Sequence, residues 1–240
     1  MLLSPTTLDL WISSKLAGFL GQYPLFDAAV QSAIRHNVLG GLWYGMALFV
    51  FWVRGKSSGQ DRVQRRILTI LVGSLIAILF SLLAERALSH LPPSRHPDLA
   101  GLFPNYMETN PNLNSFPSQS ATVYTCIAAG IYSLNRPAGL LLWGAVALLV
   151  ALPRMYVGGH YLSDVIAGLI LGLAGYIIAR RGLEQPLVSR VERLMEGSAT
   201  FRTAAEIVVF VWILQVAVEF REANWFWEGM GTLRRALSGP

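Results

Sequence analysis

The sequence predicts an all-α fold: a polytopic membrane helical bundle with about six transmembrane helices, preceded by N-terminal interfacial helices. The first observation is composition, since 53% of the 240 residues are hydrophobic, only 14% are charged, and the mean hydropathy is +0.47. These values exclude an ordinary soluble or disordered chain. The second observation is the recurrence of charge-free apolar runs near the length of a spanning helix. The runs cover residues 38–53, 67–84, 121–135, 138–153 and 165–179, with a weaker run at 207–218.

The first 36 residues have a different pattern. Asp9, Lys15, Asp27 and Arg35 interrupt the apolar residues, as is typical of helices that lie in a membrane interface. No basic stretch precedes the first apolar residues, so a cleavable signal peptide is not expected. We therefore divide the chain into an N-terminal interfacial segment (1–36), a transmembrane domain (37–220) and a C-terminal tail (221–240).

The net charge of +5 and the isoelectric point near 9.7 do not indicate a nucleic-acid partner, because the basic residues form short clusters between the apolar runs. If all six runs cross the bilayer, one face collects eleven of the nineteen Lys and Arg residues. This excess predicts that face to be cytoplasmic. The segments 89–116 and 153–161 then share the outer face.

The first outer segment, 89–116, is rich in Pro, Asn and His and has no periodicity, so it is predicted to be a loop, and loops of this length are usually functional. It follows Glu85 and Arg86 and returns to the bilayer through residues 117–120. A purely structural interpretation makes Arg86 and Arg95 interfacial anchors and Ser118 a helix N-cap.

The second outer segment carries His160 and Asp164, four residues apart. If a helix begins near His160, both side chains share one face, and the carboxylate can accept a hydrogen bond from one imidazole nitrogen while the other stays free. The alternative is a pair that only caps and anchors the helix. Ionisable residues so close to the hydrocarbon layer favour the functional interpretation.

The arginines of both outer segments, together with this histidine and carboxylate, predict a phosphate site. Guanidinium groups bind phosphate oxygens bidentately, and N–H groups at a helix start also bind anions. A histidine beside a phosphate can attack phosphorus, and water can then open the phosphoramidate. The sequence has neither a Walker loop nor an acidic cluster for magnesium, so we expect no metal and no cofactor.

These residues resemble the type 2 phosphatidic acid phosphatases, the PAP2 or lipid phosphate phosphatase superfamily. That family carries a Lys with a downstream Arg-Pro, a Pro-Ser-Gly-His, and a Ser-Arg followed six residues on by His and four beyond by Asp. Arg154, His160 and Asp164 match the third motif, with Pro153 in place of Ser. Residues 117–120 resemble the second motif, and Arg86 with Arg95 loosely resembles the first. The resemblance covers roughly residues 83–172.

The resemblance implies a role for each matching position. His160 is expected to be the nucleophile and Asp164 its orienting partner. The family's second histidine, the general acid, falls at Ser120, whose hydroxyl has no useful pKa for that role. His90 or His96 on the outer loop would have to substitute. The residues expected to bind the substrate phosphate are Arg86, Arg95, Ser118, Gln119 and Arg154.

We therefore expect an integral-membrane lipid phosphatase that works through a phosphohistidine intermediate at the outer face, in a bacterial inner membrane with a periplasm-facing site. The favoured substrate is a polyprenyl (undecaprenyl-type) diphosphate. The alternatives are a phosphatidylglycerophosphate or phosphatidic acid phosphatase, and a non-hydrolysing member of the fold that binds or transports a lipid phosphate. Within the bundle, five glycines are predicted to allow close helix packing: Gly130, Gly144, Gly168, Gly172 and Gly175.

Overall fold

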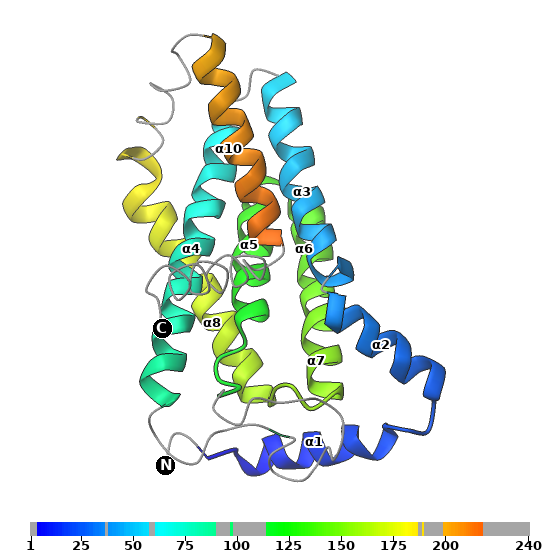
Figure 1. Ribbon diagram of the computed structural model, residues 1–240. Helices are drawn as coiled ribbons and strands as arrows, with labels where there is room; N and C mark the ends of the chain where they lie inside the picture. Colours follow the sequence, from blue (N-terminus) through cyan, green and yellow to red (C-terminus); the bar gives the residue numbers. More distant parts are fainter. Residues whose placement is uncertain are drawn as a thin grey trace, which may run out of the picture.

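The computed structural model describes residues 4–36, 38–57, 61–89, 97, 114–186, 189 and 199–217. Their regular structure is helical throughout (Figure 1). The elements in chain order are α1 (Thr7–Phe19), α2 (Pro24–His36), α3 (Val38–Ser57), α4 (Asp61–Ser89), α5 (Gln119–Leu134), α6 (Arg136–Ala145), η1 (Val146–Ala151), α7 (Leu152–Tyr156), α8 (Leu162–Ile178), η2 (Ala179–Leu183) and α10 (Ala199–Ala217). Each of the six predicted apolar runs overlaps a helix. The predicted tail 221–240 lies outside the described residues.

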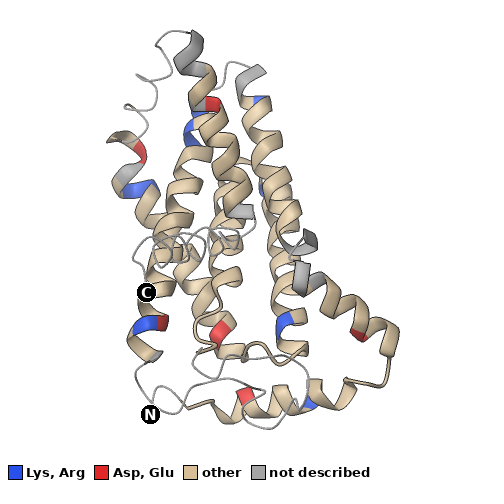
Figure 2. Cartoon of the chain, in the orientation of Figure 1, with Lys and Arg blue, Asp and Glu red and all other residues tan. Residues whose placement is uncertain are grey.

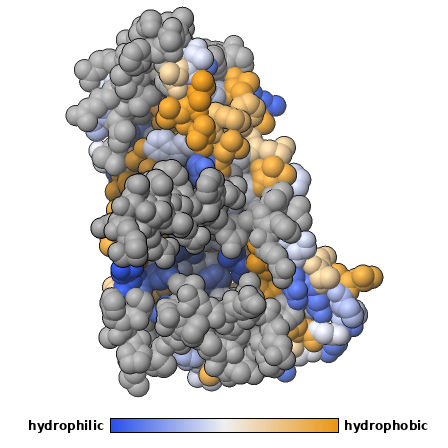
Figure 3. All heavy atoms as spheres, viewed as in Figure 1, coloured by the Kyte–Doolittle hydropathy of each residue, from blue (hydrophilic) through white to orange (hydrophobic). Residues whose placement is uncertain are grey.

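Within the described part of the chain, three helical segments are long and apolar enough to cross a membrane: Arg62–Leu88, Arg136–Tyr156 and Leu162–Gly182. The total of about six spans stays a prediction. Figure 3 shows apolar side chains gathered over α10 and α3. Phe49, Val53 and Phe210 are among the large apolar residues exposed there. A contiguous apolar surface of this kind suits contact with lipid tails.

The central helix of the bundle is α5. Every residue from Ser120 to Ile131 is buried, and the helix packs against α4 and α8. Tyr44 of α3 stacks on Tyr124 of α5, with ring centroids 4.3 Å apart. The first turn of α5 lies at the end of the bundle where α4 and α7 end and α8 begins (Figure 1).

Close glycine contacts fix how α8 lies on α5. Four of the five glycines predicted to allow close helix packing are in tight contacts: Gly168 and Gly172 of α8 lie against the α5 segment, while Gly175 of α8 and Gly130 of α5 lie against α4. A Cβ added to Gly168 would lie 2.6 Å from the carbonyl oxygen of Ser118, and one added to Gly172 would lie 2.2 Å from that of Thr122. The prediction is wrong for Gly144, where an added Cβ would meet no atom of the described residues within 4 Å.

The segment around Pro153 differs from the predicted loop. The helix continues through α7 to Tyr156, so Arg154 lies on a helical turn. Proline in a helix removes one hydrogen bond and clashes with the carbonyl four residues back. The π-helical segment η1 directly precedes α7, and such a widened turn is where a helix absorbs a disruption of this kind. The connection before α8 is therefore limited to residues 157–161, which are buried or half-buried.

The two N-terminal helices lie against the end of the bundle that α8 enters. Figure 1 shows α1 running across this end. Asp9 is buried and accepts hydrogen bonds from the Ser163 backbone N–H at 2.9 Å and from the Ser163 hydroxyl at 2.7 Å. Asp27 is also buried and accepts a hydrogen bond from the Tyr156 hydroxyl. These carboxylates therefore join the helices to the bundle, while a membrane-surface position for α1 and α2 stays a prediction.

Candidate active site

The turn between α7 and α8 sets the spacing of Arg154 and His160. The Gly159 N–H donates to the Arg154 carbonyl at 2.8 Å, and the Gly158 N–H donates to the Met155 carbonyl at 3.1 Å, which is the pattern of a Schellman helix cap. Gly158 has a φ of 73°, in the left-handed region that glycine adopts without a Cβ penalty. Arg154, in the last turn of α7, and His160, just before α8, are therefore held on either side of one compact turn.

The imidazole of His160 is held by a backbone carbonyl. Its Nδ1 lies 2.8 Å from the Ser115 carbonyl oxygen. Because a carbonyl oxygen only accepts hydrogen bonds, Nδ1 carries the hydrogen, and the lone pair of the neutral ring is on Nε2. The side chain is 15% exposed, so it is held in place and still reachable. Nε2 is therefore the atom that can react with a ligand.

Asp164 lies close to this ring but does not make the predicted hydrogen bond. Its Oδ2 is 3.9 Å from His160 Nδ1 and accepts the Tyr161 backbone N–H at 2.8 Å. The helix α8 begins at Leu162, after the histidine, so the two side chains do not share a helical face. The Ser115 carbonyl, and not the Asp164 carboxylate, lies within hydrogen-bond distance of His160 Nδ1. The buried carboxylate remains near enough to attract an imidazolium, and its orienting role stays a prediction.

The start of α5 is joined to the start of α8. The Ser118 backbone N–H donates to the Asp164 carbonyl at 3.1 Å. The Ser118 hydroxyl is buried and has no hydrogen-bond partner among the described residues. An unpaired buried hydroxyl costs about 1–3 kcal/mol, which a ligand oxygen could relieve. Ser118 therefore offers a donor near His160.

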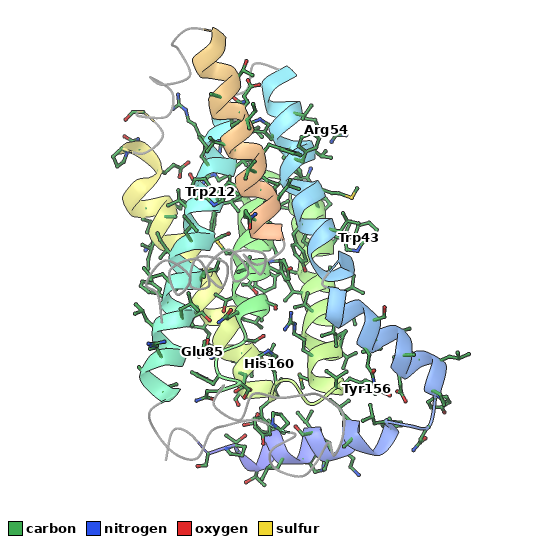
Figure 4. All side chains as sticks on the ribbon, in the orientation of Figure 1. Trp43, Arg54, Glu85, Tyr156, His160 and Trp212 are labelled. Atoms are coloured by element: carbon green, nitrogen blue, oxygen red, sulfur yellow. The ribbon has the colours of Figure 1, made fainter. Side chains whose placement is uncertain are left out.

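The end of α4 reaches the same region. The Gln119 side-chain nitrogen donates to Glu85 Oε2 at 2.7 Å. Arg86 follows in the last turn of α4 and is exposed. Figure 4 shows Glu85 and His160 at the same end of the bundle. The Gln119 amide is thus engaged with a carboxylate, and its predicted contact with a phosphate stays a prediction.

The structure therefore brings together residues from three of the predicted segments. Ser120, which stands where the resemblance places the general-acid histidine, is buried in the first turn of α5. Arg95, His90 and His96 lie outside the described residues.

Three contributors to this region were not predicted: the Ser115 carbonyl, the Glu85 carboxylate and Asp9. For Asp9 a local signal existed, because Thr6 and Asp9 form a capping box at the start of α1. Its contact with Ser163 joins residues 154 positions apart, and sequence periodicity carries no signal for such a pair.

Comparison with known proteins gives the family. A family model described as the PAP2 superfamily matches residues 66–185, half of the chain. A protein of Escherichia coli (strain K12) named "Putative undecaprenyl-diphosphatase YbjG" is 28% identical over 131 residues, which cover 55% of this chain and 62% of that relative. The chain thus spans less than two thirds of the length of this relative. No solved structure matches.

The family match extends over the end of α4, all of α5 and the α7–α8 turn, so it contains Arg86, Ser118, Arg154, His160 and Asp164. Members of this family are integral membrane proteins, and its phosphatases are metal-independent phosphate ester hydrolases that act on lipid phosphates. This chain belongs to the PAP2 superfamily.

Proposed function

We propose that this chain is a phosphatase that removes the terminal phosphate of a lipid diphosphate, with a polyprenyl (undecaprenyl-type) diphosphate as the favoured substrate. Family membership supports phosphate ester hydrolysis without a metal, and the name of the Escherichia coli relative supports a diphosphate substrate. The single observation that carries the mechanism is the 2.8 Å contact between His160 Nδ1 and the Ser115 carbonyl. That contact leaves Nε2 as the nucleophilic atom.

The reaction takes two steps. The lone pair of His160 Nε2 attacks the terminal phosphorus, the bond from phosphorus to the bridging oxygen breaks, and the lipid monophosphate leaves. Asp164, 3.9 Å from Nδ1, opposes the positive charge that the ring acquires. Water then attacks the phosphohistidine, releasing inorganic phosphate and restoring the neutral ring. Arg154, Arg86 and Ser118 hold the phosphate oxygens during both steps.

The preference for a diphosphate follows from Ser120. General acid catalysis contributes about 10²- to 10⁴-fold, and it matters most for a strongly basic leaving group. A lipid monophosphate must expel an alkoxide, whereas a diphosphate expels a phosphate monoester, which is a far weaker base. A site with serine at the acid's position therefore favours the diphosphate. The site faces the periplasm of a bacterial inner membrane in this proposal, because the basic excess lies at the opposite end.

The test is phosphate release by the purified chain in detergent, with polyprenyl diphosphate as substrate. We expect His160→Ala to abolish release, and Arg54→Gln, an exposed change on α3, to preserve it. A chelator should have no effect on the unsubstituted chain. Radiolabelled phosphate should be trapped on the protein in an acid-labile, base-stable form, and this label should be absent from His160→Ala. Equal release by both proteins, or activity that returns only with magnesium or zinc, would contradict the proposal.

A second function is favoured by one observation. With serine at position 120, the chain would bind a lipid phosphate without hydrolysing it if the missing acid is essential. In that case a lipid diphosphate would raise the thermal stability of the protein, this rise would depend on Arg154, and no phosphate would be released. Release that depends on His160 would exclude this second function.

A further inference from the structure

A strongly basic pocket lies at the end of the bundle opposite His160. Its volume is about 720 Å³, and the described residues that line it include the four arginines Arg65, Arg66, Arg180 and Arg181, with Glu184 as the single carboxylate among them. Figure 2 shows Lys and Arg residues at this end on α3, on α4 and beyond α8. Four guanidinium groups facing one carboxylate leave a positive excess that suits an anion.

One of these arginines is held in place with a donor left over. Arg66 is buried, 7% exposed, and its Nη1 lies 3.2 Å from Glu184 Oε2 and 3.3 Å from the Tyr176 hydroxyl. The Tyr176 hydroxyl in turn donates to Ser133. The Nε of Arg66 is buried and has no hydrogen-bond partner among the described residues. A fixed guanidinium with an unused N–H is suited to bind a phosphate oxygen.

A second pocket of about 640 Å³ adjoins the first and shares Arg180 with it. Apart from Arg136, its lining is mainly apolar and aromatic, and it includes Tyr132, Trp143, Leu173 and Ile177. Tyr132, Leu173 and Ile177 are exposed on the molecular surface. The two pockets together combine a basic chamber with an apolar wall, which matches a phosphate joined to an acyl chain.

The depth of the basic pocket also fits a lipid head group. Arg66 and Glu85 lie nineteen residues apart on α4, which is about 28 Å of helix. The hydrocarbon core of a bilayer is about 30 Å thick. The pocket is therefore at the opposite membrane boundary from His160, the boundary that carries the basic excess.

We propose that this pair of pockets binds one anionic phospholipid from the leaflet opposite the candidate active site. Its phosphate contacts Arg66, Arg180 and Arg181, and its acyl chain lies along Leu173 and Ile177. This site is separate from the one that contains His160, and its occupancy does not depend on the proposed hydrolysis.

The test is lipid binding to the purified full chain in detergent, measured by native mass spectrometry with phosphatidylglycerol and phosphatidylcholine as probes. We expect the unsubstituted chain to retain phosphatidylglycerol and the Arg180→Gln/Arg181→Gln variant to bind it about 25-fold more weakly, since each arginine near an anionic lipid contributes about fivefold. The matched control is Arg54→Gln/Arg62→Gln, which removes two exposed charges outside both pockets. This control should bind within about twofold of the unsubstituted chain.

Three outcomes would overturn the proposal. Equal weakening in both double variants would indicate general attraction to basic protein. Equal retention of phosphatidylcholine would remove the need for a net negative lipid. Glycerol phosphate binding as tightly as phosphatidylglycerol would show a site for a free phosphate in which the apolar wall has no role.

Discussion

The hydroxyl of Ser118 is buried without a hydrogen-bond partner in the part of the chain that the structure describes, and this makes its contribution separable from folding. We expect Ser118→Ala to lower kcat/KM for a lipid diphosphate roughly 10- to 100-fold, because a hydrogen bond to a charged group contributes about 1.5–3 kcal/mol. Thermal stability should not fall, since no protein hydrogen bond from the hydroxyl is lost. Steady-state kinetics and thermal unfolding in detergent measure both effects.

The control for this experiment is Thr125→Val. Thr125 lies two turns further along α5 and also has a buried hydroxyl with no partner among the described residues. Its removal should leave kcat/KM unchanged. A stability loss in Ser118→Ala with unchanged kinetics would mean that the hydroxyl serves the fold alone.

We expect Ser120 to determine which leaving groups the site tolerates. Ser120→His should accelerate hydrolysis of phosphatidic acid by a larger factor than hydrolysis of a polyprenyl diphosphate, because only the alkoxide strongly needs a proton. Parallel assays of both substrates with both proteins measure the two factors. Equal acceleration, or none, would show that position 120 is not the place of the acid.

The side chains of the candidate site could be predicted from the sequence, whereas its backbone contacts could not. Residue types and spacing alone pointed to Arg154, His160 and Asp164, because reactive side chains near a membrane are rare. They gave no sign that a backbone carbonyl, that of Ser115, holds the imidazole. Any residue can supply a carbonyl, so such a contact leaves no mark in the residue pattern.

The carboxylate of Asp9 attaches α1 to the start of α8, and both of its oxygens accept hydrogen bonds. Asp9 accepts from Ser163 through Oδ1 and Oδ2, and from Thr6 through Oδ2. Burial alone would raise the pKa of Asp9, but the hydrogen bonds from Ser163 and Thr6 outweigh it, so the pKa is lowered. Docking should therefore be fully present above the usual aspartate pKa, about 3.9, and be lost as the pH falls through the lowered value.

Two measurements test this docking. Asp9→Asn should open α1 to proteolysis at neutral pH, because an amide has a single acceptor oxygen, while Lys15→Gln on the same helix should not. In the unsubstituted chain, cleavage within α1 by pepsin should begin only below the usual aspartate pKa, about 3.9. Early cleavage at pH 5, or an unchanged pattern in Asp9→Asn, would contradict the assigned role.

The contact between α5 and α8 depends on glycine. Gly168→Ala and Gly172→Ala should each destabilise the chain by about 1–3 kcal/mol, because the added Cβ would overlap a backbone carbonyl of α5. They should also lower activity by shifting Ser118 from Asp164. The control is Gly144→Ala, whose added Cβ meets no atom in the described part of the chain and which should be neutral or stabilising. Thermal unfolding of the three variants in detergent gives the comparison, and equal losses would exclude close packing as the cause.

Helix positions were largely predictable, because apolar runs of this length admit few alternatives. Helix ends were harder. The run ending at Pro153 suggested a loop, and the structure instead places a π-helical segment before the proline, so that α7 continues to Tyr156. The close contact of Gly144 was wrongly expected because small residues on a helix allow packing without showing which face meets a neighbour.

The whole molecule is expected to have its two phosphate sites at opposite membrane boundaries. Single cysteines in a Cys126→Ala background test this arrangement. Lys15→Cys and Ala87→Cys, both exposed near the candidate active site, should react with an impermeant thiol reagent in intact cells. Gly182→Cys, at the other end, should react only after the cells are permeabilised. Labelling of Gly182→Cys in intact cells would show that the orientation is the opposite of the expected one. Labelling of only one of Lys15→Cys and Ala87→Cys would show that α1 and the end of α4 lie on different sides of the membrane.

Both α5 and α8 begin at the end that holds His160 and run in the same direction through the bundle. Each helix carries a macrodipole equal to about half a positive charge at its N-terminus, so the two add where the phosphate is expected. The helices that end there, α4 and α7, carry Arg86 and Arg154 in their last turns, and these offset the negative ends. We therefore expect part of the attraction for anions at this end to come from the direction of these helices, so that removing one arginine should weaken phosphate binding without abolishing it.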